Sequence, residues 1–289
     1  MIGKVLQRAF HMTSSSAHGE IALFRAFIHA FNALGYNALA QEFHGNRYQV
    51  TFSAARGAGR AVPRCELCDV MIIHYPAGNP SAARITFNQA KVTNNSLICD
   101  PITSVPYNFR ANLEQWDLLS NRPSIKAATA KMQLPCNLLS HALLPSIGTF
   151  GVFYPKGSGF DFAYFVADGL SPLKNNATRS GTLQWGTPLG QVRKIGHYHE
   201  RTATCCMYTF GEALELGLIG SPLQQLIYGS SESVEIRNWL RSVLSSLQEM
   251  HPDSELPNEL LDGLELTNEE SSWTDDRSKP RAVVLVRTG

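Results

Sequence analysis

The segment from Arg64 to Thr93 constrains the fold most strongly, because it reads as two adjacent strands. Two apolar runs rich in β-branched residues flank a break that contains Pro, Gly and Asn. Asp69 begins the first strand, and the triplet Gln89-Ala90-Lys91 lies toward the end of the second. Because side chains alternate along a strand, Gln89 and Lys91 point to the same face. The two strands therefore predict an amide and an ammonium group side by side, opposite a carboxylate one strand away.

The flanking segments predict a mixture of helices and strands. Residues 17–34 carry one apolar stripe at helical spacing, and Gly35 is a natural end for that helix. Glu20 lies in its first turn, where a carboxylate is either a solvated first-turn acid or part of a site. The other elements expected from periodicity are strands at 36–43, 47–53, 149–154, 160–167, 202–210 and 282–287 and helices at 109–119, 137–144, 211–218 and 233–247.

Composition indicates a globular protein without a membrane span. Of the 289 residues 44% are hydrophobic, and no apolar run reaches membrane-spanning length. Residues 1–16 lack the apolar core of a secretory signal, so we expect a cytoplasmic protein, with an amphipathic targeting peptide left open. Six cysteines in a chain of this size predict reduced thiols and no disulfide framework.

Charge is distributed unevenly along the chain. Residues 1–241 carry 21 Lys and Arg against 14 Asp and Glu, whereas residues 242–289 carry 4 against 10. The mildly basic body is compatible with a polyanionic partner. The acidic stretch 248–276 is expected to be flexible or to bind a partner, and it could also occupy a basic cleft of the body.

Two further groups of residues suggest ligand contacts. The Gly-rich segment 54–64 contains Arg56, Arg60 and Arg64, which predict either a phosphate-contacting loop or a solvated one. Zinc-type ligands occur at Cys65 and Cys68, at His197 and His199, and at Cys205 and Cys206. These pairs are far apart in the sequence, so buried packing thiols and polar loop histidines are the simpler interpretation.

The order of a helix with an acid, a strand, a strand beginning with Asp and a strand ending in Gln-x-Lys resembles the PD-(D/E)xK nuclease superfamily. Within it the chain is most similar to Mrr-like restriction endonucleases and to nuclease domains of prokaryotic anti-phage systems. Glu20, Asp69, Gln89 and Lys91 carry the resemblance, which covers roughly residues 17–120. The chain departs from the pattern because no Pro precedes Asp69 and because Gln replaces the usual acid at position 89.

The resemblance implies a role for each of these residues. Asp69, the Gln89 side-chain carbonyl and the Ala90 backbone carbonyl would hold Mg²⁺ or Mn²⁺, and Glu20 would bind through water or help to hold a second ion. Lys91 would orient or deprotonate the attacking water and counter charge on the phosphate.

We therefore expect an α/β, restriction-endonuclease-like fold with a mixed central sheet flanked by helices. The nuclease domain would cover residues 1–230, and residues 231–289 would form a C-terminal helix, an acidic segment and a terminal strand. The expected function is metal-dependent hydrolysis of double-stranded DNA by an endonuclease of an anti-phage system, controlled by a partner protein or by self-assembly. The alternatives are a catalytically inactive nuclease-fold scaffold and a ribonuclease on the same fold.

Overall fold

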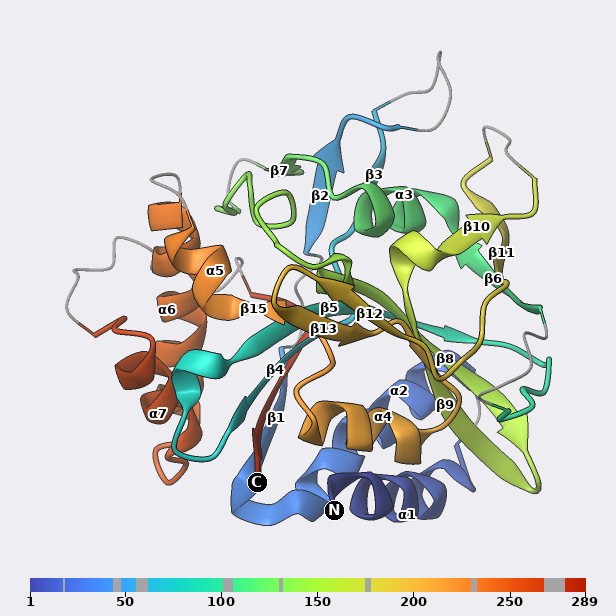
Figure 1. Ribbon diagram of the computed structural model, residues 1–289. Coiled ribbons are helices and arrows are strands. Elements are labelled where there is room, and N and C mark those ends of the chain that lie inside the picture. The colour runs from blue at the N-terminus through green and yellow to red at the C-terminus, as the bar shows by residue number, and fades with distance from the viewer. Residues whose placement is uncertain are drawn as a thin grey trace.

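A mixed eight-stranded sheet forms the centre of the described chain (Figure 1). The structure is a computed structural model, which describes residues 1–17, 19–43, 48–55, 62–100, 106–129, 132–174, 178–229, 233–267 and 279–289. In spatial order the sheet strands are β1 (Ala38–Glu42), β16 (Ala282–Thr288), β4 (Val70–Pro76), β5 (Arg84–Val92), β8 (Gly148–Lys156), β9 (Gly159–Val166) and β14 (Ala203–Thr204), with β15 (Ser221–Pro222) paired to β5. The predicted α/β class with a mixed central sheet flanked by helices is confirmed.

The two strands predicted between Arg64 and Thr93 are β4 and β5. They pair antiparallel, with Val70 opposite Asn88 and Ile73 opposite Ile85. β8 then pairs parallel to β5, and β9 returns antiparallel to β8, which confirms the predicted hairpin.

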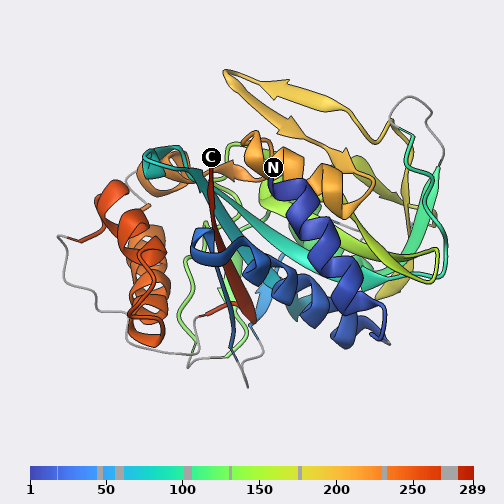
Figure 2. The same cartoon turned by 90° about the horizontal axis from the view of Figure 1, so that it is seen from below.

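Both faces of the central sheet are buried, as the alternation along β4 shows. Val70 and Ile72 belong to one apolar cluster, and Met71 and Ile73 belong to another. The first face is covered by α1 (Ile2–Ser14), α2 (Gly19–Ala30) and α4 (Met207–Glu215), which lie together in Figure 2. The second is covered by α3 (Leu113–Asn121), α5 (Leu223–Tyr228), α6 (Val234–Met250) and α7 (Leu256–Gly263).

Two smaller sheets pack on the second face. One consists of β3 (Arg64–Glu66), β2 (Gln49–Phe52) and β7 (Ile125–Ala127), and the other of β10 (Leu170–Pro172), β11 (Ser180–Trp185) and β6 (Tyr107–Asn112). A separate hairpin is formed by β12 (Val192–Ile195) and β13 (Tyr198–Arg201). Short 3₁₀ helices lie at Phe31–Asn37, Pro80–Ala82, Pro145–Ile147 and Ala167–Gly169. β3 leads directly into the turn that carries Asp69.

The C-terminal strand is confirmed, and its position is central. β16 lies between β1 and β4, antiparallel to the first and parallel to the second. The predicted boundary at residue 230 therefore separates this strand from the sheet to which it belongs.

The acidic stretch is folded over most of its described length, so the expectation of a flexible arm is wrong there. α7 buries Leu256 and Leu260 against α6 and the second face of the sheet. Glu259 accepts a hydrogen bond of 2.7 Å from the Tyr75 hydroxyl and pairs with Arg287. Residues 268–278 lie outside the described residues. This packing leaves the described part of the stretch in the body of the fold.

Several local predictions were wrong, and for residues 107–112 the reason is that strand pairing with β11 overrode helical spacing. Residues 107–112 form β6, and helix α3 begins only at Leu113, where the Asn112 side chain caps it. Residues 136–141 form turns, and the strand expected at 202–210 gives way to α4 after residue 204. Residues 2–14, left open as a targeting peptide, form α1, which buries Leu6 and Phe10. No helix in the described ranges has the length and apolar character needed to cross a bilayer.

Candidate functional site

Asp69 lies where β4 begins, beside the end of β5. Its backbone N–H donates to the Asn88 carbonyl at 2.9 Å, and its Oδ2 accepts from the Ala90 N–H at 2.8 Å. The side chain is buried, with 7% of the residue exposed. These two bonds fix the carboxylate against the peptide between Gln89 and Ala90, next to the Gln-x-Lys triplet.

Arg281 supplies a positive charge to Asp69 that the sequence did not predict. Because β16 runs parallel to β4 with Val283 opposite Met71, Arg281 comes level with Asp69. The Arg281 Nη1 lies 3.6 Å from Asp69 Oδ1, and the guanidinium carbon lies 5.3 Å from the centre of the Phe24 ring in α2. This guanidinium therefore links the start of β16 to β4 and to helix α2.

Gln89 is fully buried, yet only one end of its amide is satisfied. Its Nε2 donates to the Glu66 carbonyl at 3.2 Å. Its Oε1 has no hydrogen-bond partner among the described residues. A buried acceptor without a donor costs about 1–3 kcal/mol, so this oxygen is available to a ligand.

Lys91 is half-buried, and its Nζ donates to the Ala90 carbonyl at 2.7 Å. β5 is regular through this triplet, so Gln89 and Lys91 point to the same face, as expected. Together with Asp69, the triplet places carboxylate, amide and carbonyl oxygens and one ammonium on adjoining residues. Oxygen donors of this kind are those that hard divalent cations prefer.

Glu20 is less closely associated with this group than predicted. It is exposed in the first turn of α2, and among the described residues it has no hydrogen-bond or ion-pair partner. It precedes Phe24 by four residues, which is about one helical turn, and Phe24 carries the Arg281 guanidinium. The same helix contributes Arg25, whose Nε lies 3.6 Å from a Glu42 oxygen at the end of β1.

The arginine segment is only partly described. Arg56 and Arg60 lie outside the described residues. Arg64 is exposed on β3, where its Nε donates to Gln49 Oε1 at 2.7 Å. This bond holds the Arg64 guanidinium on the small sheet that precedes Asp69.

The zinc-type ligands suggested by the sequence do not form one group. Cys65 and Cys68 are buried packing residues, and burial, followed by nearby carboxylates, raises the pKa of both thiols well above the usual value. Within the described ranges, the one close group of three His, Cys, Asp or Glu side chains that could hold a metal ion is Cys99, Cys205 and Cys206. It includes neither His197 nor His199.

Cys99 and Cys205 are joined by a disulfide, so the prediction of reduced thiols is wrong for this pair. Cys99 is contributed by the loop after β5, which sequence spacing could not place beside Cys205.

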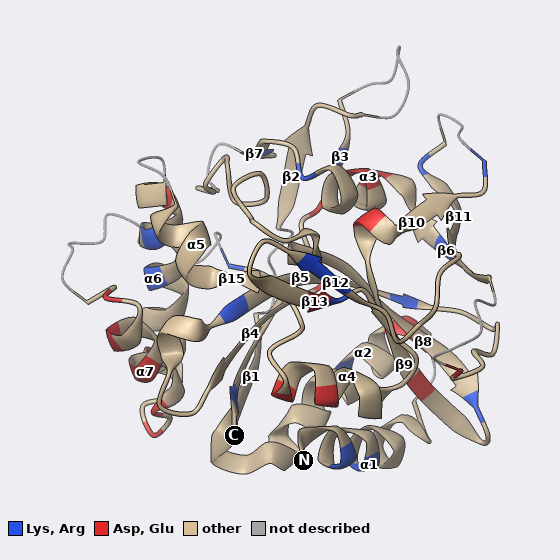
Figure 3. Ribbon diagram, viewed as in Figure 1, with Lys and Arg blue, Asp and Glu red and all other residues tan. Residues whose placement is uncertain are grey.

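Basic and acidic residues are interspersed over the described chain, with acidic residues prominent on α4 and α7 (Figure 3). This distribution differs from the charge asymmetry along the sequence, because folding brings the acidic C-terminal stretch against the basic body. Glu259 beside Arg287 is one example. Charge alone therefore does not identify a partner surface.

Comparison of the chain with protein-family models, with curated proteins and with solved structures finds no match.

Proposed function

We propose that this chain is a metal-dependent nuclease of the restriction-endonuclease-like class, acting on DNA phosphodiester bonds. The proposal is supported by helix α2 and strand β1 preceding β4 and β5 in the chain, although β2 and β3 of a smaller sheet lie between β1 and β4. Asp69 lies next to the start of β4, and the Gln-x-Lys triplet lies on the adjacent strand β5. β16 is inserted between β1 and β4 in this sheet. The anti-phage role remains an expectation from the resemblance.

The observation that carries the proposal is the unpartnered Gln89 Oε1, in the residue next to Ala90, whose N–H binds the Asp69 carboxylate. Gln89 Oε1, the Asp69 carboxylate and the Ala90 carbonyl are oxygen donors of the kind that Mg²⁺ and Mn²⁺ favour. When bound, such an ion would act as a Lewis acid and lower the pKa of a coordinated water.

The chain's own residues would supply positioning and charge. Lys91, held next to the Ala90 carbonyl, would orient the attacking water and stabilise negative charge that builds on the phosphate. The N–H of Ala90 keeps the Asp69 carboxylate in place for the ion. Arg64 would contact a neighbouring phosphate once its bond to Gln49 is exchanged.

The alternative of a catalytically inactive nuclease-fold scaffold is favoured by a different observation. Arg281 already supplies a positive charge 3.6 Å from Asp69, and Gln89 brings no negative charge to the site. An ion must therefore compete with a guanidinium for the only carboxylate of this group. An inactive scaffold would keep the Arg281–Asp69 pair and would need no metal.

Cleavage of supercoiled plasmid in Mg²⁺ or Mn²⁺ tests the proposal. We expect the wild type to cut DNA, and Asp69→Asn and Lys91→Ala each to reduce the rate by about 100-fold or more, because each removes charge used in the reaction. Lys194→Ala is the matched control, since Lys194 is an exposed lysine on β12. Equal rates in the wild type and both site variants would exclude this mechanism. Cleavage of RNA but not of DNA would reassign the substrate.

A further inference from the structure

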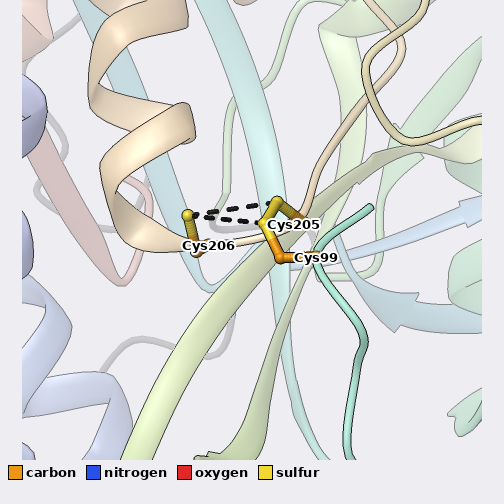
Figure 4. Close-up of side chains that lie close together, drawn as sticks. All are labelled: Cys99, Cys205 and Cys206. Carbon is orange, nitrogen blue, oxygen red and sulfur yellow. Dashed lines mark hydrogen bonds between the residues drawn. A yellow bond between two sulfur atoms is a disulfide. The ribbon is translucent and has the colours of Figure 1, made fainter. Parts of the chain in front are cut away.

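Three cysteines from two distant segments meet beside helix α4 (Figure 4). Cys99 lies in the loop after β5, and Cys205 and Cys206 lie where β14 turns into α4. Besides the Cys99–Cys205 disulfide, the Cys206 sulfur lies 3.9 Å from the Cys99 sulfur and 4.0 Å from the Cys205 sulfur. Cys206 is thus nearly equidistant from the two bonded sulfurs.

This equidistance does not suit thiol–disulfide exchange. Attack on a disulfide proceeds in line, so the attacking sulfur should be about 2 Å farther from the leaving sulfur than from the sulfur it attacks. Here the two distances differ by only 0.1 Å. Cys206 therefore faces the disulfide from the side, and the three sulfurs form a triangle.

We propose that Cys99, Cys205 and Cys206 form a thiolate site for one Zn²⁺ ion, which becomes available when the Cys99–Cys205 disulfide is reduced. Zinc binds thiolates at about 2.3 Å, which places two sulfurs of a tetrahedral site about 3.8 Å apart. The distances from Cys206 to its two neighbours already match this value. The Cα atoms of Cys99 and Cys205 are 5.1 Å apart, so the freed sulfurs can separate by side-chain rotation.

The chemistry balances with a small thiol as reductant. Two thiol molecules donate two electrons and two protons to the disulfide and become a disulfide themselves, leaving Cys99 and Cys205 as thiols. Zn²⁺ then replaces the protons of three thiols, which pass to solvent. The fourth position would be taken by water or by the Thr209 hydroxyl, which lies 3.4 Å from the Cys206 sulfur.

The surroundings of the three cysteines stabilise a thiolate and give an ion access to the site. Cys206 is the N-cap of α4, and its sulfur accepts from the Thr209 N–H, so the helix N-terminus stabilises negative charge there. The Tyr154 hydroxyl donates to the Cys205 carbonyl at 2.6 Å and holds the backbone in place. Cys99 is exposed, and a cavity of about 250 Å³ beside Cys99 and Cys205 provides an entry path. A bound ion would hold the loop after β5 against α4, as the disulfide does.

The test uses the full chain, reduced without oxygen by an excess of small thiol that is then removed, and Zn²⁺ alone as the probe. We expect one bound Zn²⁺ per reduced chain by elemental analysis, and none in the oxidised chain. With Co²⁺ in place of zinc, a sulfur-to-cobalt charge-transfer absorption should appear. Binding of zinc by the oxidised chain, or none by the reduced chain, would overturn the proposal.

The zinc affinity of the Cys206→Ser variant tests whether Cys206 is a ligand. Serine is a good N-cap, so α4 should remain folded, which thermal unfolding checks. We expect this variant to lose more than the roughly 10- to 100-fold in affinity that an outer-shell change costs. Cys136→Ser, at an exposed free cysteine, is the matched control and should bind as the wild type does. Equal affinity in Cys206→Ser and wild type would assign the metal to other residues.

Discussion

Gln89 combines a bonded donor with a free acceptor in a side chain that has no exposed surface. Its Nε2 is committed to the Glu66 carbonyl, and its Oε1 has no partner within the described chain. The strand alternation that predicted its direction follows from β geometry alone. Its burial and its bond depend on the Glu66 carbonyl of β3 coming close to β5, which the sequence did not reveal.

Gln89→Glu should make the stability of the fold depend on metal. The new carboxylate would face the Glu66 carbonyl without a proton to donate, so we expect a loss of about 1–3 kcal/mol in the free energy of unfolding without metal. A bound Mg²⁺ would neutralise the carboxylate and recover much of this loss. Thermal unfolding with Mg²⁺ and with a chelator measures both values. The same loss under both conditions would contradict a metal ligand at position 89.

His74 should give the fold a defined sensitivity to acid. Burial lowers the pKa of this imidazole from 6.5 to about 4, nearby Arg84 acts in the same direction, and the hydrogen bond to the Ile219 carbonyl opposes them. Between these values the unfolded chain binds a proton that the folded chain excludes. Stability should therefore fall by about 3 kcal/mol as the pH drops from 6.5 to 4. Urea unfolding of the wild type and of His74→Gln at several pH values tests this. If the free energies of unfolding of the wild type and of His74→Gln change in parallel with pH, this role of His74 is contradicted.

At the scale of elements, close helix contact determines how the first face is covered. α1 and α4 approach at Gly3 and Gly211, and a Cβ on Gly211 would lie 2.5 Å from the Gly3 Cα. For these segments, the sequence predicted a helix only at 211–218, expected a strand at 202–210 and left residues 1–16 open as a targeting peptide. Which two helices pack together depends on Gly3 and Gly211 facing each other, and this long-range placement was not predicted.

Gly211→Ala should therefore destabilise the protein despite the better helix propensity of alanine, which is worth about 1 kcal/mol. We expect a net loss of roughly 1–3 kcal/mol, since α1 must move away from α4. Gly186→Ala is the control, because a Cβ there meets no other atom within 4 Å. Equal melting temperatures for the two variants would contradict the close packing of α1 on α4.

At the scale of the whole molecule, the candidate site is assembled from parts distributed over almost the entire chain. Asp69 and the Gln-x-Lys triplet were predictable, because they lie on two strands consecutive in sequence. Arg281 was not, although its strand was expected, because the sequence does not specify which strand it pairs with or in which direction. The proximity of Cys99 to Cys205 was missed for the same reason. Local pattern predicts elements, whereas long-range pairing determines which side chains share a site.

The proposed mechanism depends on whether the oxygens around Asp69 hold an ion, and calorimetric titration with Mg²⁺ measures this binding. The wild type should bind, Asp69→Asn should lose binding, and Arg281→Gln should bind several-fold more tightly, since the competing positive charge is gone. Lys194→Ala should match the wild type. No Mg²⁺ binding by either the wild type or Arg281→Gln would contradict the proposed metal site and favour the inactive scaffold.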